Sequence, residues 1–86
     1  MGERKLHKGD ICISEIVCHT KLEYGWEAHY GCEIRIIRYT YAPRKIGHYY
    51  RAYNITLDRY ETVNQDTLSL SEKSKRKHIL EKILEK

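Results

Sequence analysis

The sequence predicts a mainly β protein with one C-terminal helix. Between positions 9 and 70, short runs rich in Ile, Tyr and Thr alternate with turn signals made of Gly, Pro, Asn and Asp. Within two of these runs the apolar alternation changes phase, which is typical of the bent strands that curl a small sheet into a barrel. After residue 70 the chain becomes rich in Lys, Glu and Leu and contains neither Gly nor Pro. We therefore expect a small barrel of about five bent antiparallel strands over residues 1–70 and a helix over 71–86.

The size of the chain limits what it can build. Its 86 residues are enough for one domain, and a domain of this size buries only about 60% of the surface of its unfolded chain. With 41% hydrophobic and 33% charged residues the composition is that of a globular protein. No run of apolar residues is long enough for a membrane span, and the N-terminus lacks the apolar segment of a signal peptide. We expect a soluble intracellular protein.

The first half of the barrel is predicted from two bent runs. Residues 8–10 form a turn signal, and residues 11–18 alternate with a change of phase near Ser14, which predicts a bulged first strand. Residues 20–25 are predicted as a loop. Residues 26–41 are predicted as one long or bent strand, because its alternation also changes phase, after Ile36.

The second half is predicted from clearer alternation. The run 43–47 is predicted as a hairpin-type connection. Residues 48–57 form a strand with Tyr49, Arg51 and Tyr53 on one face and Tyr50, Ala52 and Asn54 on the other. A turn at 58–59, a short strand at 60–63 and a last β segment at Leu68 and Leu70 complete the barrel.

The helix is predicted from its start signal and its apolar stripe. Ser69 and Glu72 match a capping box. Four apolar residues then recur on one side, in a narrow stripe that can lie across the open end of a barrel: Ile79, Leu80, Ile83 and Leu84. The first half of the helix is nearly all basic, which is usual for a solvated face and also suits an acidic partner.

Aromatic and basic residues mark a candidate binding surface. The chain has eight Tyr, one Trp and no Phe, and a net charge of +4. Cations interleave with Tyr residues in the middle of the chain, a composition typical of surfaces that contact nucleic-acid phosphates. The alternative is a sheet face kept soluble by its charge. The candidate phosphate-binding residues are Arg35, Arg38, Arg44, Lys45 and Arg51.

Nothing in the sequence indicates catalysis. It has no nucleophile elbow, phosphate loop, metalloprotease motif or paired carboxylates in a recognisable context. We expect no enzyme activity, no cofactor and no metal. The odd number of cysteines indicates reduced, buried thiols. A zinc site built from Cys18, His19, His29 and Cys32 is the alternative, but their spacing is not that of a zinc finger.

Four segments, in order, resemble a known family. KLHKGDICIS resembles its start, where an acidic residue after Gly begins the first strand, and 26–29 resembles its aromatic, acidic, Ala, Lys strand motif. Residues 50–53 resemble its central strand and 54–60 its next turn and strand. The family is the chromo-barrel domain of the MRG and male-specific-lethal chromatin proteins, related to the Tudor-knot domain of MYST-type acetyltransferases. The resemblance implies an SH3-like barrel followed by a helix.

The resemblance also implies a function. Family members read methylated lysine on histone tails with an aromatic cage and work within histone acetyltransferase or deacetylase complexes. Carried over to this sequence, the family's cage positions correspond to Trp26 and Tyr53. The family's insertion after the central strand is missing here, and its Trp before Asp58 is Leu57, so the other cage walls fall to Tyr24, Tyr30, Tyr50 or Tyr60. The implied protein is a nuclear, monomeric chromatin regulator that binds histone tails, methylated or not.

Two further hypotheses come from the residues themselves. The first is a sequence-independent DNA- or RNA-binding barrel that uses the five cations. The second is a protein-interaction domain or small inhibitor that uses the Tyr-rich face. Strong salt dependence of binding distinguishes the first from the second.

Overall fold

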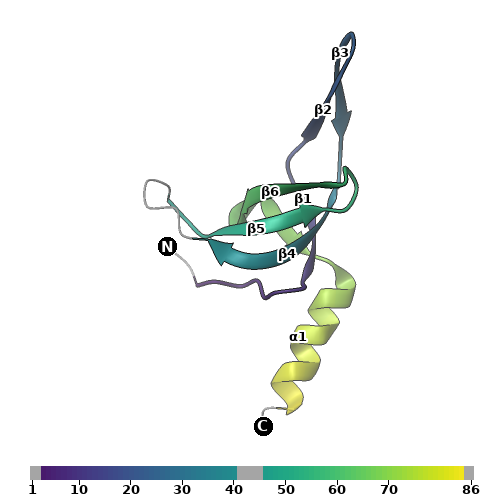
Figure 1. Ribbon diagram of the computed structural model, residues 1–86. Coiled ribbons are helices and arrows are strands. Elements are labelled where there is room, and N and C mark those ends of the chain that lie inside the picture. Colours follow the sequence, from purple (N-terminus) through teal and green to yellow (C-terminus); the bar gives the residue numbers. More distant parts are fainter. Residues whose placement is uncertain (1–2, 41–45, 85–86) are drawn as a thin grey trace.

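A computed structural model, which describes residues 3–40 and 46–84, contains two antiparallel sheets and one helix (Figure 1). The prediction of a mainly β protein with a C-terminal helix is therefore confirmed. The described elements, in chain order, are β1 (Ile11–Ser14), β2 (Cys18–Leu22), β3 (Gly25–His29), β4 (Glu33–Thr40), β5 (Tyr49–Asn54), β6 (Arg59–Asn64), the 3₁₀ turn η1 (Gln65–Thr67), β7 (Leu68–Leu70) and α1 (Glu72–Leu84).

The main sheet is open. Its strand order is β6-β5-β4-β1-β7, so within the described residues β6 and β7 are its two edges and do not pair with each other. The expected closed barrel is not formed. Strands β2 and β3, which we expected in the barrel wall, pair only with each other, and the five remaining strands do not complete a ring.

Two interruptions of the chain create the separate hairpin. The run 11–18 is broken after Ser14, whose hydroxyl donates a hydrogen bond to the Ile16 carbonyl, 3.0 Å away. The run 26–41 is broken at Gly31, whose φ of 63° few residues other than glycine adopt easily. Residues 20–25, expected to be a loop, instead contain the end of β2, a tight turn and the start of β3. The change of phase near Ser14, which we interpreted as a bulge, is therefore an interruption between two separate strands.

One predicted bend is a bulge. The pairing between β4 and β5 slips between Ile36 and Arg38, which leaves Ile37 as the extra residue. In β5 the predicted alternation is confirmed, since Tyr50, Ala52 and Asn54 are buried and the residues between them are half-buried. The core is small and lies on the inner face of the main sheet. It consists of Leu6, Cys12, Cys32, Ile34, Ile36, Tyr50 and Ala52.

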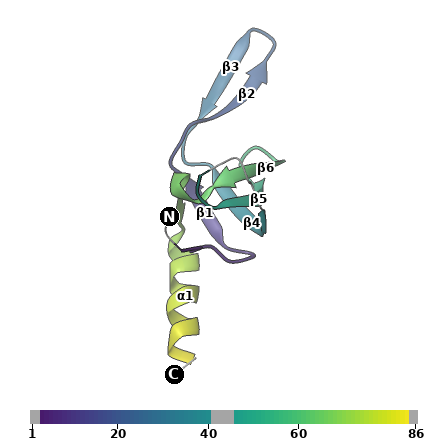
Figure 2. The ribbon, with the colours of Figure 1, turned by 90° about the vertical axis from the view of Figure 1, so that its left-hand side faces the viewer.

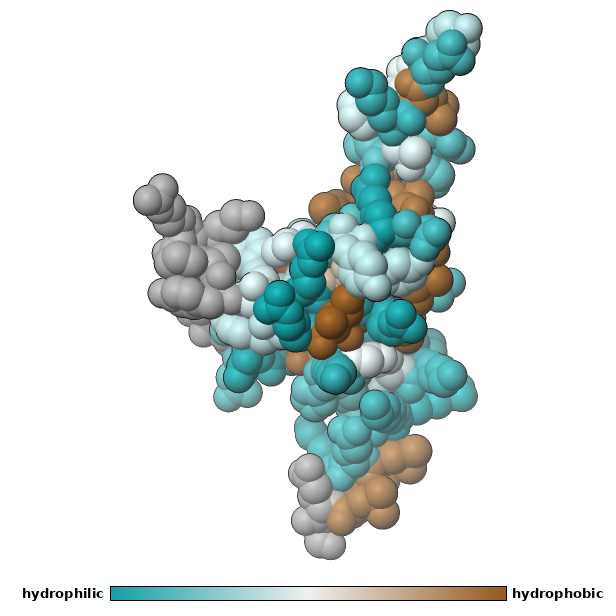
Figure 3. Space-filling model, in the orientation of Figure 1, coloured by the Kyte–Doolittle hydropathy of each residue, from teal (hydrophilic) through white to brown (hydrophobic). Residues whose placement is uncertain are grey.

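The polar side of helix α1 attaches it to the rest of the chain. Ser71 accepts a hydrogen bond from the Ser74 backbone N–H (3.3 Å), so it takes the capping role that we assigned to Ser69, whose hydroxyl instead donates to Glu15. The Ser74 hydroxyl accepts from the Ile11 backbone N–H at 2.8 Å. Beyond this contact the apolar stripe is exposed rather than laid across a barrel, as the space-filling view shows at the far end of α1 (Figure 3).

The overall shape is elongated. The β2–β3 hairpin projects from one end of the main sheet and α1 from the other (Figures 1 and 2). The molecule measures 55 × 30 × 17 Å, and its radius of gyration is 14.3 Å, whereas a compact domain of this length has about 12 Å. The described helix is too short and too polar to cross a lipid bilayer.

Candidate functional site

The outer face of β4, β5 and β6 gathers cations and aromatic rings. Arg35 of β4 lies opposite Tyr53 of β5, which lies opposite Tyr60 of β6. In the next outward row Arg38 lies opposite Arg51. Because these residues alternate with the buried ones, their side chains share the face that is turned away from the core. We call these five residues the Arg/Tyr face.

The rings and guanidinium groups of this face are packed together. The Tyr53 and Tyr60 rings meet edge to face, with centroids 5.1 Å apart and planes at 62°. The Arg35 guanidinium lies over the Tyr53 ring at 5.5 Å and that of Arg51 over the Tyr60 ring at 6.0 Å. Each arrangement is within cation–π range. The rings and guanidinium groups of this face therefore contact one another and are not independent surface side chains.

The positive charge of this face is not neutralised. Within the described residues, none of its three arginines forms a salt bridge; the nearby ion pair joins Arg59 to Glu61 instead. Arg38 and Arg51 are directly opposite each other, and like charges in that position destabilise a sheet. The strand does carry one acid, Glu33, two residues before Arg35. A face that retains adjacent like charges is suited to bind an anion.

The predicted phosphate-binding residues fall into two groups. Arg35, Arg38 and Arg51 are brought together as predicted. Arg44 and Lys45 lie outside the described residues. Tyr60 was expected only as a substitute cage wall, and its strand register makes it the partner of Tyr53.

The predicted cage residues are not brought together. Trp26 lies beside the tip of the β2–β3 hairpin, paired with Lys21, whereas Tyr53 lies in the main sheet. Trp26, Tyr24 and Tyr30 are exposed, Tyr24 almost completely. The indole of Trp26 lines only a shallow hollow that it shares with His19. Trp26 and Tyr53 therefore do not form two walls of one cage.

Tyr50 needs a correction, because it belongs to the core. Its side chain is 1% exposed, and its hydroxyl donates a 2.8 Å hydrogen bond to Gln65 Oε1. Its ring packs edge to face on Tyr39 at 5.5 Å. Burial raises the pKa of the Tyr50 hydroxyl. The side chains of β5 point alternately to the two faces of the sheet, so Tyr50 and Tyr53 lie on opposite faces. Tyr50 is therefore on the face opposite to any ligand that Tyr53 holds.

The cysteines have the environment of core residues. All three are free thiols, and Cys12 and Cys32 are fully buried. Burial, with a smaller effect from Asp10, raises the pKa of Cys12 to about 12, and burial also raises that of Cys18. Thiols of this kind are inert. The alternative zinc site at Cys18, His19, His29 and Cys32 is not assembled among the described residues.

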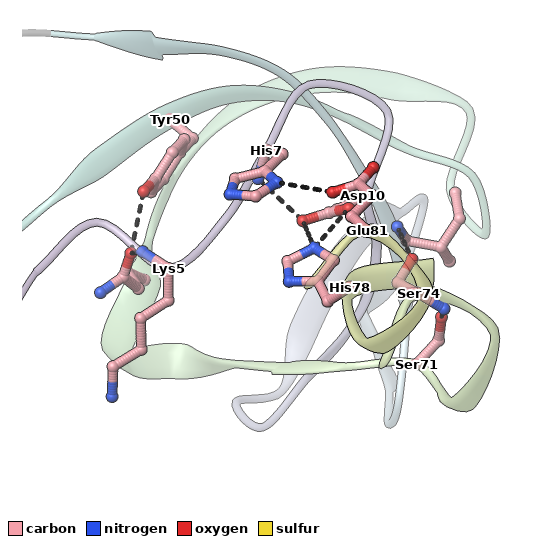
Figure 4. Close-up of polar contacts among 10 residues, drawn as sticks. Lys5, His7, Asp10, Tyr50, Ser71, Ser74, His78 and Glu81 are labelled. Carbon is pink, nitrogen blue, oxygen red and sulfur yellow. Dashed lines mark hydrogen bonds and ion pairs between the residues drawn. The ribbon is translucent and has the colours of Figure 1, made fainter. Parts of the chain in front are cut away.

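A polar cluster that the sequence analysis missed lies where α1 meets the sheet (Figure 4). It contains His7, Asp10 and His78, whose potential metal-ligand atoms lie within 4.8 Å of one another. Glu81 is adjacent, with Oε2 at 3.9 Å from His7 Nδ1. Sequence alone gives no signal for this cluster, because 68 residues separate Asp10 from His78.

Comparison with known proteins identifies no relative: no family model, no curated protein and no solved structure matches this chain.

Proposed function

We propose that this chain is a sequence-independent binding module for single-stranded nucleic acid, which contacts its ligand through the Arg/Tyr face. The observation that supports this proposal is the grouping of three arginines without acidic partners and two exposed or half-buried tyrosines on one sheet face. Guanidinium groups bind phosphate oxygens, and tyrosine rings stack on bases of any identity. The ligand is single-stranded because only unpaired bases offer their faces for stacking.

The salt dependence of binding follows from the number of cations. Three phosphate contacts on a single strand give a slope of about −2 for log affinity against log salt. The affinity should therefore fall about twentyfold between 50 and 200 mM salt. Stacking of bases on Tyr53 and Tyr60 contributes a part of the binding free energy that does not depend on the salt concentration.

The test measures fluorescence anisotropy of a labelled single-stranded oligonucleotide at several salt concentrations. The double variant Arg38→Gln/Arg51→Gln should bind at least tenfold more weakly and with a shallower salt slope. The matched control, Lys73→Gln/Arg76→Gln, removes the same charge from the exposed side of α1 and should bind nearly as tightly as the wild type. Equal losses in both double variants, or binding that is insensitive to salt, would contradict the proposal.

A second candidate function is histone-tail binding, and one observation favours it. The edge-to-face pair of Tyr53 and Tyr60 forms a two-ring corner that could hold a methylated lysine. This candidate depends on the resemblance to the chromo-barrel family. The description of the open sheet as SH3-like belongs to the same proposal. The nucleic-acid proposal comes first because it also uses Arg38 and Arg51, which form no salt bridge within the described residues and for which a methylated lysine offers no anionic partner.

One NMR experiment separates the two candidates. The labelled protein is titrated with unmethylated and mono-, di- and trimethylated lysine peptides, and separately with the oligonucleotide. Shifts at Tyr53 and Tyr60 that require methylation support the histone reader. Shifts over Arg35, Arg38 and Arg51 that disappear at high salt support nucleic-acid binding.

A further inference from the structure

The cluster of His7, Asp10 and His78 joins two parts of the chain that are distant in sequence. His7 belongs to the N-terminal segment, Asp10 directly precedes β1, and His78 lies on α1. Glu81 follows His78 by three residues, which puts the two side chains on the same side of the helix. The four side chains converge in one place (Figure 4). They offer two imidazoles and two carboxylates.

Asp10 is the fixed member of the cluster. Its side chain is fully buried. Its Oδ2 accepts a hydrogen bond from the His7 backbone N–H at 2.8 Å, and its own backbone N–H donates to the His7 carbonyl at 3.0 Å. The turn that these bonds close is what brings the His7 ring back towards α1. Hydrogen bonds that orient a carboxylate in this way are typical of metal ligands.

The potential ligand atoms of His7, Asp10 and His78 lie within 4.8 Å of one another. His78 Nε2 lies 2.9 and 3.1 Å from the two oxygens of Asp10. The His7 ring stacks on the His78 ring with centroids 4.5 Å apart and planes at 15°. Carboxylate oxygens are only acceptors, and a neutral imidazole has one acceptor nitrogen. A metal ion can therefore take the place of the proton that now lies between His78 Nε2 and Asp10.

We infer that His7, Asp10 and His78, with Glu81 as the fourth ligand, form a binding site for a divalent cation of the zinc type. Two imidazole nitrogens and two carboxylate oxygens make a tetrahedral donor set that zinc prefers over Mg²⁺. Ligand bonds of about 2.1 Å require donor atoms about 3.4 Å apart. His78 Nε2 and Asp10 Oδ2 are already slightly closer than this, at 2.9 Å. Glu81 Oε2, in contrast, is 3.9 Å from His7 Nδ1, and the His7 ring must turn out of its stack on His78. His7 and Glu81 are 58% and 44% exposed, so their side chains can rotate to complete the site.

The site has a structural consequence for the fold. Within the described residues α1 is held to the sheet at its start by Ser71 and Ser74, and further along by the contact of His78 with Asp10. A metal bound at His78 and Glu81 would strengthen this second attachment. Metal ions commonly stabilise domains whose core is as small as this one. The site is independent of the Arg/Tyr face and does not rest on the proposed function.

The test titrates zinc chloride into the full chain in a reducing buffer that contains no metal-binding thiol. Two-dimensional ¹H–¹⁵N spectra of the histidine rings should show zinc-dependent shifts of His7 and His78 and not of His19, His29 or His48. Magnesium chloride should shift none of them. The melting temperature should rise with zinc concentration, because the ion binds only the folded state.

Variants locate the site by calorimetry. His7→Ala should weaken zinc binding at least tenfold and leaves the Asp10–His78 pair in place, so the chain should still fold. Glu81→Gln should weaken binding to a smaller extent. The matched control, His19→Ala, removes an exposed histidine outside the cluster and should bind as the wild type does. Unchanged affinity in His7→Ala, zinc shifts centred on Cys18 and Cys32, or no zinc binding at submillimolar concentration would each overturn the inference.

Discussion

At the scale of single residues, Gln65 connects the N-terminal segment to the core. Its Oε1 accepts hydrogen bonds from the Tyr50 hydroxyl and from the Lys5 backbone N–H, both at 2.8 Å. Its Nε2 donates to the Glu3 carbonyl at 2.9 Å. Gln65 itself is buried. The buried Tyr50 hydroxyl thus donates its proton to the Gln65 amide.

We predict strong coupling between these two side chains. Gln65→Ala leaves the proton of the buried Tyr50 hydroxyl without its acceptor and should cost about 2–3 kcal/mol of unfolding free energy. Tyr50→Phe removes the group that needs the partner and should cost about 1 kcal/mol. The double variant should be less destabilised than the sum of the two, in a double-mutant cycle measured by urea unfolding. Simple additivity would mean that the hydrogen bond contributes nothing.

Residue patterns predicted part of the candidate site. The alternation of β5 was sufficient to put Arg51 and Tyr53 on one face, because the side chains of a strand change sides at every residue. It did not show which face is buried. Only the packed sheet, in which Tyr50 reaches Gln65, decides that Tyr50 belongs to the core.

At the scale of elements, the β2–β3 hairpin is the least buried part of the sheet structure. Four of the five residues of β3 are exposed, and His29 is half-buried. Trp26, the only tryptophan of the chain, is 65% exposed. A residue so exposed contributes little to stability. The hairpin therefore projects from the main sheet and does not form part of the barrel wall that we expected.

We predict that Trp26 contributes little to the stability of the fold and reports on its surroundings by its fluorescence. Trp26→Ala should change the unfolding free energy by no more than about 0.5 kcal/mol. The fluorescence of the wild type should be that of a solvated indole and should move little on unfolding in urea. The comparison variant Ile36→Ala, at a buried position of the main sheet, should cost about 2–5 kcal/mol. A blue-shifted emission that moves to longer wavelength on unfolding would contradict the exposed position of the indole.

Element types were predictable, and their partners were not. The bulge in β4 and the helix after residue 70 follow from local patterns, and both are confirmed. The same kind of phase change at Ser14 was a chain break, because a local hydrogen bond to Ile16 ends the strand there. A bulge and a break both shift the alternation by one residue, so sequence does not distinguish them.

At the scale of the whole molecule, stability depends on a few buried groups in a small core. Three groups in or beside this core have raised pKa values in the folded state, each chiefly because of desolvation: Cys12, to about 12, Tyr50, and the half-buried Cys18. The unfolded chain loses the Cys12 proton near the ordinary value of 9.0, whereas the folded chain retains it. Rising pH therefore favours the unfolded state in this range.

We predict that the fold loses stability at alkaline pH. The loss should begin as the pH rises through about 9, where unfolded thiols ionise, and should increase towards pH 12. Urea unfolding midpoints at pH 7, 9 and 10.5 measure it. In Cys12→Ala one of the titrating groups is absent, so the decline between pH 9 and 10.5 should be shallower than in the wild type. Equal stability of the wild type at pH 7 and 10.5 would contradict the burial of these groups.

The sequence by itself determined the class of the fold, the outward pattern of β5 and the existence of the terminal helix. These features depend on residues that are neighbours along the chain, whose alternation and propensity act locally. The tertiary structure alone decided that β2 and β3 leave the main sheet, that Trp26 and Tyr53 lie apart, and that His7, Asp10 and His78 meet. Each of these depends on the path of the chain between distant residues, which is set by the packing of the whole sheet and not by any local pattern.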